Sequence, residues 1–347
     1  MRYSIPFSRR AKIVAALILA ALVCAVLIVF QTHPRHTEEM PLRIALAQQP
    51  SSALAIIALD AGFFRQAGLE VEFHSFPSGK RGLEEGLLAG KTDVATVSDL
   101  PAIIRLAEGA PVVIIATIQA VRSVNAIVAR PDQDIESIAD LKGRRVGVQP
   151  LSAVHFFAHQ ALLAGGVSPD EVQMVFYRIE DLPTALAAGD IDAVSIREPY
   201  ISMIRQQTDD RAIIMEHPWV YPQFEFLVVQ RDFSRTSPKA LIRMLQALFM
   251  AEKLINEHPE ESAAILANAL DIPASQGAAI MNNTINRVSL NQSLLTLIKL
   301  QLAWLHENGQ SIPDASPEIL EFFDFSILQQ IEPARIDIAG FGYMETE

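Results

Sequence analysis

The chain has 347 residues, of which half are apolar and 20% are charged, and its formal net charge is −12. This composition excludes intrinsic disorder and is typical of a globular protein, while the length favours two lobes. Residues 1–30 contain four basic and no acidic side chains, so the rest of the chain has 24 basic against 40 acidic residues, a formal charge of −16. Such a charge disfavours nucleic acid as a partner.

The N-terminal region contains an uncharged, mostly aliphatic run from Ile13 to Phe30. As a helix this run would be about 27 Å long, close to the hydrocarbon thickness of a bilayer. Because the basic residues precede it, the part after about His33 is expected outside the cytoplasm. We therefore predict that residues 1–36 form a short cytoplasmic stub and a single-pass inner-membrane anchor; cleavage as a signal and lipidation at Cys24 stay open as alternatives.

Cys24 is the only cysteine and lies inside this apolar run. The folded part of the chain therefore has no disulfide and no thiolate for catalysis or metal binding.

After residue 41, short aliphatic runs alternate with amphipathic stretches, which is the pattern of an α/β fold. The pattern recurs about one hundred residues later, and a shared A-G-x-x-D sequence marks the recurrence. Three pairs of segments match: Arg43–Gln48 with Arg145–Gln149, Leu69–Phe76 with Val172–Arg178, and Ala89–Ser98 with Ala188–Arg197. Two copies indicate duplicated lobes and not a stacked solenoid, the alternative being chance similarity between common βα units.

The chain is expected to cross between the lobes at Asn125–Arg130 and again at Phe224–Gln230. Lobe 1 would then comprise residues 37–127 plus 228–347, and lobe 2 residues 128–227. Beyond the second crossing, four segments have a helical pattern and are expected to pack on lobe 1: Pro238–His258, Ser262–Leu270, Ala274–Val288 and Asn291–Asn308.

Ligands of open α/β sheets bind outside the carboxyl ends of the strands, where loops lead into helix N-termini. Ser52, Ser78 and Ser152 stand at such places, directly before helical patterns. Ordinary N-capping explains a serine at each position. The functional interpretation adds that helix N-termini converging on one cleft offer hydrogen bonds and a positive dipole to a polar or anionic ligand. Both interpretations can hold together.

Asp99 and Glu198 occupy equivalent points of the repeat, each at the end of a predicted strand. A carboxylate in a ligand cleft suits an amine or a ring N–H and repels a bare oxyanion. The alternative is structural: Asp99 would cap the helix around Pro101. Glu198 would then pair with Arg197 or Arg178.

His155 and His159 have the H-x-x-x-H spacing that can bring two imidazoles to one metal, but no carboxylate accompanies them. We expect no metal, with His155 directed toward the cleft from the first helical turn. The chain also lacks phosphate-loop, G-x-S-x-G and H-E-x-x-H sequences, so neither catalysis nor a cofactor is predicted.

Several segments between residues 42 and 230 carry a resemblance to a known family: Ala58–Phe64, Gly68–Val71, Pro77–Gly79, Leu88–Asp93, Gly109–Val113, Ile138–Val148, Ala188–Ala193 and Glu198–Tyr200. Through them the chain resembles the SsuA/THI5-like, or NMT1-like, solute-binding proteins of ABC transporters, which take up sulfonates, nitrate, taurine or thiamine precursors. The resemblance implies a type II periplasmic-binding-protein fold, with two lobes that close over a small-molecule ligand in a central cleft. It also implies an ABC-transporter permease as partner. We further expect a monomer, located outside the cytoplasm and without enzymatic activity.

By position, the family's ligand-facing loops correspond to Gln48, Ser52, Ser78, Ser98, Asp99, Ser152 and Glu198. Two departures from the family pattern bear on the ligand. Arg197 stands where the family usually has Trp before Glu-Pro-Tyr, and Ser98-Asp99 replaces the small neutral residues of many sulfonate binders. Both departures leave an aromatic or amine-bearing solute open.

Two other classes of function remain as alternatives. The first is an enzyme on the same fold, of the pyrimidine-synthase or menaquinone-pathway type, although a single cysteine argues against the former. The second is a membrane-anchored sensory or partner-binding module, which would ordinarily need a cytoplasmic output domain.

Overall fold

The computed structural model describes residues 39–121, 125–198, 200–216, 222–310 and 318–339. The predicted anchor, Ile13–Phe30, and the rest of residues 1–38 lie outside these ranges. None of the helices in the described ranges is both long and apolar enough to cross a membrane.

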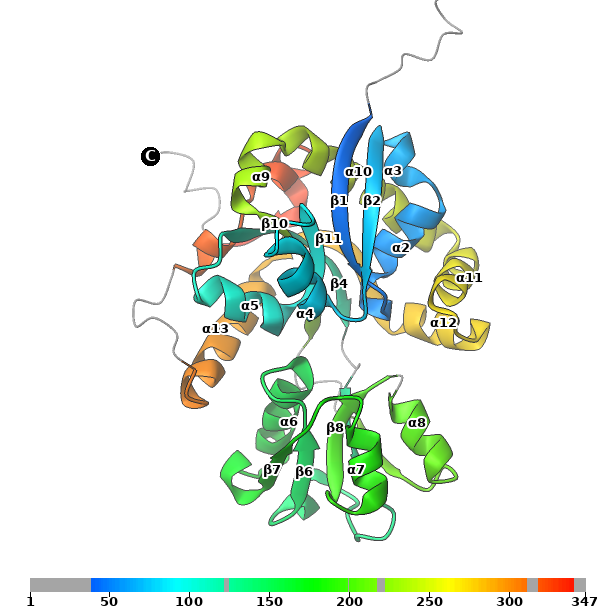
Figure 1. The fold of residues 1–347 in the computed structure, drawn as a ribbon, viewed down its shortest axis with the longest axis vertical. Helices are drawn as coiled ribbons and strands as arrows, with labels where there is room; N and C mark the ends of the chain where they lie inside the picture. The colour runs from blue at the N-terminus through cyan, green and yellow to red at the C-terminus, as the bar shows by residue number, and fades with distance from the viewer. Residues whose placement is uncertain (1–38, 122–124, 199, 217–221, 311–317, 340–347) are drawn as a thin grey trace, which may run out of the picture. The chain divides into compact units, whose positions relative to one another are not determined.

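The described chain is built on two β-sheets (Figure 1). The larger sheet has seven strands in the order β12-β11-β4-β10-β3-β1-β2. Their bounds are Met40–Ala47 (β1), Leu69–Phe76 (β2), Val94–Ser98 (β3), Val112–Val121 (β4), Gln223–Gln230 (β10), Thr284–Asn291 (β11) and Ile336–Asp337 (β12). The smaller sheet has five strands in the order β7-β6-β8-β5-β9. Their bounds are Asn125–Ala129 (β5), Arg145–Val148 (β6), Gln173–Phe176 (β7), Ala193–Arg197 (β8) and Ile213–Glu216 (β9).

The predicted repeat is confirmed by the way the two sheets are built. In the larger sheet β2, β1 and β3 are parallel neighbours, and β10 joins antiparallel between β3 and β4. In the smaller sheet β7, β6 and β8 are parallel neighbours, and β5 joins antiparallel between β8 and β9. The inserted antiparallel strand of each sheet, β10 or β5, adjoins a crossing between the sheets, β9 to β10 or β4 to β5. The larger sheet has in addition β11, antiparallel to β4, and β12, parallel to β11. The lobe boundaries at 127/128 and 227/228 stay a prediction.

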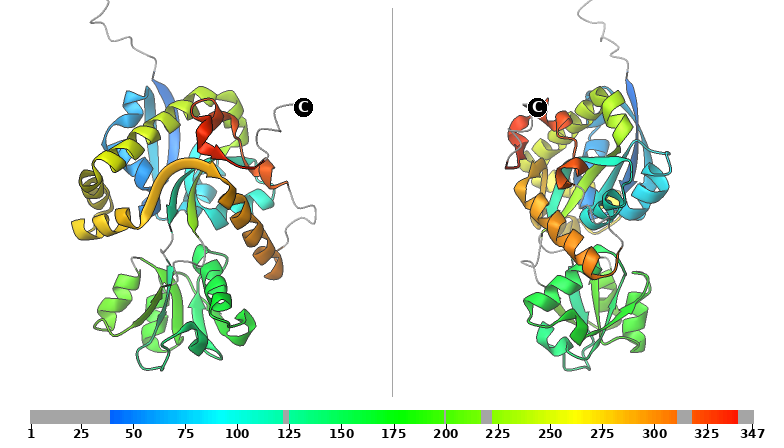
Figure 2. Two further views of the ribbon diagram at one scale, coloured as in Figure 1. Left: turned by 180° about the vertical axis from the view of Figure 1, so that it is seen from behind. Right: turned by 90° about the vertical axis from the view of Figure 1, so that its left-hand side faces the viewer.

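Helices flank both sheets (Figure 2). Those associated with the larger sheet are Ala53–Asp60 (α2), Phe63–Gln66 (α3), Gly79–Arg81 (α4), Asp99–Ala107 (α5), Arg231–Thr236 (α9), Pro238–Glu257 (α10), Pro259–Leu270 (α11), Ala274–Asn282 (α12), Gln292–Glu307 (α13) and Ser326–Gln329 (α14). Those of the smaller sheet are Ala153–Ala164 (α6), Leu182–Ala188 (α7) and Tyr200–Gln207 (α8). Among these helices, α10 packs against α2 and α3, and α13 packs against α5.

The C-terminal part of the chain confirms most of the predicted helices and corrects one. The prediction of a helix over Ala274–Val288 is wrong in its second half, because α12 ends at Asn282 and β11 follows and pairs with β4. In β11 Asn286, Val288 and Leu290 are buried and alternate with more exposed residues. This period of two indicates a half-buried strand.

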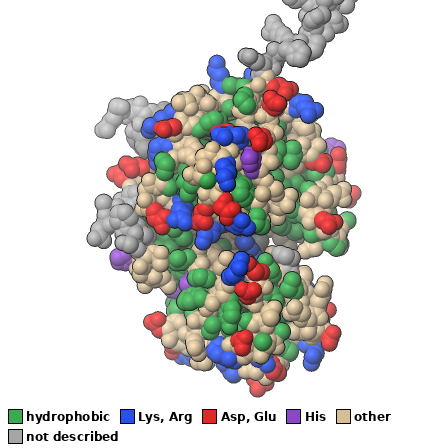
Figure 3. All heavy atoms as spheres, viewed as in Figure 1, with side chains coloured by type: hydrophobic (Ala, Val, Ile, Leu, Met, Phe, Trp, Pro, Cys, Tyr) green, Lys and Arg blue, Asp and Glu red, His purple; other side chains and the backbone are tan. Residues whose placement is uncertain are grey.

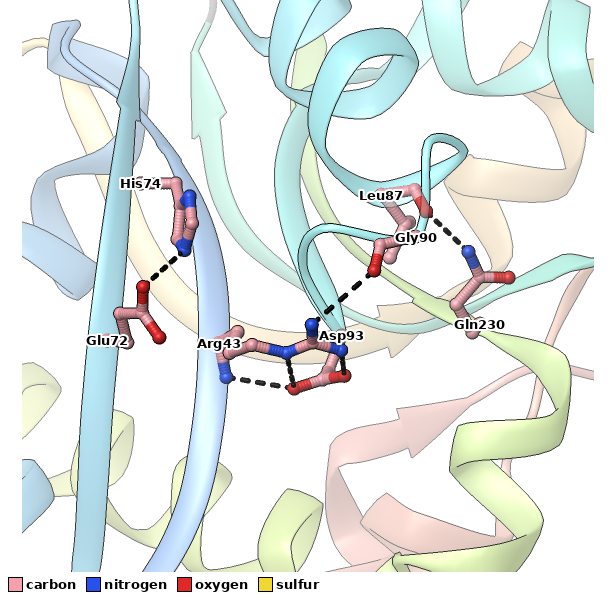
Figure 4. Close-up of polar contacts among 7 residues, drawn as sticks. All are labelled: Arg43, Glu72, His74, Leu87, Gly90, Asp93 and Gln230. Carbon is pink, nitrogen blue, oxygen red and sulfur yellow. Dashed lines mark hydrogen bonds and ion pairs between the residues drawn. The ribbon is translucent and has the colours of Figure 1, made fainter.

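The aspartates of the two A-G-x-x-D sequences have a structural role that is the same in both sheets. Asp93 accepts hydrogen bonds from the backbone N–H of Arg43 (2.9 Å) and from its guanidinium (2.6 Å), as Figure 4 shows. Asp192 accepts the same pair of bonds from Arg145, at 2.9 and 2.6 Å. The hydrogen bond from Arg145 holds the pKa of Asp192 below its usual value. Each aspartate directly precedes a parallel strand, β3 or β8, and therefore ties the neighbouring strand, β1 or β6, to it.

Candidate functional site

The loops after β1 and β3 hold the first group of predicted site residues. Gln48 is exposed, whereas Ser52 is fully buried, and its hydroxyl lies 2.9 Å from the hydroxyl of Thr96 in β3. Thr96 also accepts a hydrogen bond from the N–H of Ala47. N-capping by Ser52 is therefore wrong: it begins α2 without a side-chain cap and instead fastens the helix to β3.

Ser78 and Ser98 precede the two helices that pack next to β3. The hydroxyl of Ser78 accepts a hydrogen bond from the N–H of Arg81, at 3.3 Å, which confirms N-capping at this position. Ser98 is buried at the end of β3 and is the N-cap residue of α5, without a side-chain cap bond. Between them, Gly79 lies so close to β3 that a Cβ would come within 2.8 Å of the Cα of Val97.

Asp99 is completely buried at the start of α5, and both its oxygens are hydrogen-bonded. The N–H of Leu100 donates to one oxygen (2.7 Å), and the N–H of Phe224, in β10, donates to the other (2.9 Å). Burial raises the pKa of Asp99 to about 6, against the lowering effect of Phe224, Gln301 and Leu100. The carboxyl of Asp99 thus joins α5 to the beginning of β10, and ligand binding by this residue stays a prediction.

The second group lies at the start of α6. Ser152 caps this helix by accepting a hydrogen bond from the N–H of His155, at 3.4 Å, which confirms N-capping. The His155 ring is buried and meets the rings of Phe176 and Trp304 edge-on, with centroids 5.4 and 4.9 Å away. Burial lowers the pKa of His155 to about 4, with a smaller contribution from His159. His155 is therefore neutral at physiological pH, and its ring extends from α6 to Trp304 of α13.

The remaining predicted residue, Glu198, is exposed beside α8, where it accepts a hydrogen bond from the N–H of Ser202 at 3.1 Å. Arg178 pairs with Glu180 at 2.7 Å, so the alternative pairing of Glu198 with Arg178 is wrong. In the described ranges, His, Cys, Asp and Glu side chains nowhere gather in threes as metal ligands would.

Sequence reasoning missed a group of buried polar atoms that have no hydrogen-bond partner in the described structure. They are the hydroxyl of Ser51, the side-chain oxygen of Asn125, both carboxyl oxygens of Glu225, and both amide atoms of Gln301. We refer to these four residues as the unpaired polar cluster. Buried polar groups in native proteins are nearly always hydrogen-bonded, so these atoms are candidates for contact with a partner that is not part of the chain.

The cluster lies near the end of β3 and the start of β10, as the following contacts indicate. Glu225 pairs in register with Ser98, the last residue of β3. Gln301 influences the pKa of Asp99, and Ser51 and Asp99 both influence the pKa of Glu225. The amide of Asn125 donates to Gln223, two residues before Glu225 and hence on the same face of β10.

One sequence signal would have revealed Glu225. It is the only charged residue in the otherwise apolar run Phe224–Val229. An acidic residue inside a buried strand is rare unless it is paired or functional.

The fold, with two α/β sheets each holding an inserted antiparallel strand, is that of periplasmic binding proteins. The crystal structure of the periplasmic aliphatic sulphonate binding protein SsuA from Escherichia coli superposes with a TM-score of 0.70 at 22% identity, over 82% of this chain and 97% of that one. The structure of the desulfurization enzyme DSZB has a TM-score of 0.60 at 17% identity, over 84% of this chain and 98% of that one. The likeness establishes the fold, which both binding proteins and an enzyme share.

The chain belongs to the NMT1/THI5 like family, whose model matches residues 49–262. Putative aliphatic sulfonates-binding proteins of Bacillus subtilis and Escherichia coli are 27% and 25% identical over 72% and 62% of this chain. The taurine-binding periplasmic protein of Escherichia coli is 22% identical over 63% of this chain. These matches cover 75%, 66% and 68% of the three relatives, so for the Escherichia coli sulfonates-binding protein just under two thirds of its length is spanned.

Proposed function

We propose that this protein is an extracytoplasmic solute-binding protein of an ABC importer, which captures a small polar organic solute of the sulfonate or taurine type between two lobes. The observation that carries the proposal is the unpaired polar cluster at the carboxyl end of β3 and the start of β10. In open α/β sheets this end of the strands is where ligands bind. A captured solute supplies the missing hydrogen-bond partners and so explains why the chain keeps these groups buried.

The helices that begin beside the parallel strands provide the other half of a binding site. α5 follows β3 directly, and α6 follows β6 after a short loop that contains Leu151 with a positive φ of 50°. The positive end of the helix dipole at these N-termini favours an anionic group such as a sulfonate. Gln48, Ser78 and Ser152 lie in loops that precede helices, and Ser98 ends β3; all four remain proposed ligand-facing residues.

Two lobes and a membrane anchor complete the proposal. Lobe 1 comprises residues 37–127 plus 228–347, and lobe 2 residues 128–227. They close about the two crossings. The N-terminal segment, residues 1–36, holds the protein at the outer side of the inner membrane, where a monomer delivers solute to its permease. Acidic and basic side chains are interspersed among the described residues on the face in Figure 3, a mixed surface that suits a freely exposed domain.

A thermal-shift and calorimetric screen of the purified full-length protein tests the proposal. The panel contains alkanesulfonates, taurine, nitrate and pyrimidines. A solute that binds only the native state at about one hundred times its Kd stabilises the protein by about 3 kcal/mol, which raises the melting temperature by several degrees. A folded protein that no member of this panel stabilises would refute the binding function, and the enzymatic alternative would then be tested with the same compounds.

A further inference from the structure

Glu225 is the buried acidic residue whose hydrogen-bonding capacity is left unused. Its side chain is 1% exposed, and neither carboxyl oxygen has a hydrogen-bond partner in the described structure. The contrast with Glu252 is instructive. That carboxylate is also buried, but it accepts hydrogen bonds from the N–H of Val288 (3.1 Å) and from the guanidinium of Arg335 (2.7 and 3.0 Å). Glu252 thus forms a structural ion pair with Arg335, and Glu225 forms no such pair in the described structure.

Burial is the dominant influence on the carboxyl group of Glu225. Burial raises the pKa of Glu225 to about 8, against the lowering effect of Ser51 and of Arg197, with a further raising contribution from Asp99. The Ser51 hydroxyl is near enough to act on this pKa, yet the geometry of a hydrogen bond between the two side chains is not met. Arg197 belongs to β8 of the smaller sheet, and this residue is not free, because it takes part in an interaction within the chain.

A buried carboxyl without a partner destabilises the folded protein, because its desolvation is not offset by hydrogen bonds. The cost is removed when a bound solute brings a positive charge and several N–H donors to the two oxygens. A protonated amine has three donors and no acceptor. Three buried acceptor atoms are unpaired nearby, the two oxygens of Glu225 and the side-chain oxygen of Asn125.

We propose that Glu225 binds the protonated amine of the captured solute, so that the protein selects small zwitterions with an amine and an anionic group over solutes that lack the amine. This inference rests on the proposed solute-binding function. The amine contacts Glu225 at the start of β10, while the anionic end faces the helix N-termini of the loops described above.

Two probes that differ only in the amine test the inference: 2-aminoethanesulfonate and ethanesulfonate. Their affinities are measured by isothermal titration calorimetry for the full-length protein, for Glu225→Gln, and for the control Glu136→Gln, which alters an exposed side chain. Glutamine keeps the shape of the side chain and removes its charge. We expect Glu225→Gln to weaken binding of the aminated probe by about tenfold or more, and to change that of ethanesulfonate by less than about threefold. Glu136→Gln should bind both as the unaltered protein does.

Proton release provides a second readout. At pH 7 the unliganded carboxyl is mostly protonated, because its pKa is about 8, and an ammonium ion displaces that proton. Titrations in buffers of different ionisation enthalpy should therefore show release of close to one proton with the aminated probe, and none with Glu225→Gln. Asp99, with a pKa of about 6, and Arg197 are the other charged groups that act on Glu225, and both are present in the variant.

The inference is overturned if Glu225→Gln leaves the affinity for the aminated probe unchanged, or weakens both probes equally. It is also overturned if the unaltered protein prefers ethanesulfonate or binds neither probe. In these cases the solute-binding function itself still stands if another compound of the wider screen binds, and it fails separately if none does.

Discussion

The unpaired carboxyl of Glu225 predicts that its replacement by glutamine makes the unliganded protein more stable. The pKa of Glu225 is about 8 in the folded chain and about 4.5 in the unfolded chain. For a group whose pKa is raised by folding, the stability it contributes is fully present below the unfolded pKa and is lost as the pH rises toward the folded one. The free energy of unfolding lost between pH 4.5 and pH 7 is about 3 kcal/mol, and the loss over the whole interval between the two pKa values is about 5 kcal/mol. Glu225→Gln does not titrate and should escape this loss.

Urea unfolding followed by circular dichroism at pH 4.5, 7 and 8 measures the effect. We expect Glu225→Gln to be more stable than the unaltered protein by about 2 to 3 kcal/mol at pH 7, and the difference to vanish near pH 4.5. Glu252→Gln is the matched control with the opposite sign. It breaks a buried pair with Arg335 and should lose about 2 to 4 kcal/mol at pH 7. The reasoning is refuted if Glu225→Gln is the less stable protein at pH 7 and 8, since its carboxylate must then have a partner.

Three further outcomes are expected from other parts of the structure. Asp93→Asn and Asp192→Asn should each destabilise the protein by about 1 to 2 kcal/mol, because each breaks the pairing that ties β1 or β6 to its neighbour; ligand affinity measured by calorimetry should stay within about twofold. Gly79→Ala should cost about 1 to 3 kcal/mol in urea unfolding, since a Cβ there meets the backbone of β3 at 2.8 Å. With Trp219 replaced by Phe, Trp304 is the single tryptophan. Its fluorescence should change on saturation with solute, because the ring belongs to lobe 1 and contacts His155 of lobe 2. An unchanged fluorescence with a bound solute would contradict the proposed closure of the lobes.

The repeated architecture was predictable because it leaves a short and specific signature in the sequence. The aspartate of A-G-x-x-D has one task in both sheets, which is to accept three hydrogen bonds from an arginine of the first parallel strand, Arg43 in β1 or Arg145 in β6. A residue with such a fixed task recurs at a fixed spacing, whereas aliphatic strand residues can exchange with one another. The alternative of chance similarity between βα units fails, since the matched segments occupy equivalent strands in the two sheets.

Other features depended on contacts between distant segments and could not be predicted from local patterns. Ser52 precedes a helix as a capping residue would, but Thr96 in β3 takes its hydroxyl. The sequence Thr284–Asn291 continues a helical pattern and becomes a strand because the edge of β4 is available for pairing. Its burial alternates strictly only over Asn286–Asn291, a stretch too short to outweigh the preceding helix.

Asp99 and Glu225 show why the position of a carboxylate in the sequence does not establish its role. Asp99 ends the strand at the expected ligand edge, so sequence reasoning selects it. In the fold its oxygens are occupied by the N–H groups of Leu100 and Phe224, and a ligand would have to displace these bonds at a cost close to what it gains. Glu225 has no bonds to lose, so a donor from a ligand contributes its full free energy there. Of two equally buried acids, the one that destabilises the empty protein is the one that can discriminate between ligands, and an increase in stability on its removal would be the expected companion of a loss in selectivity.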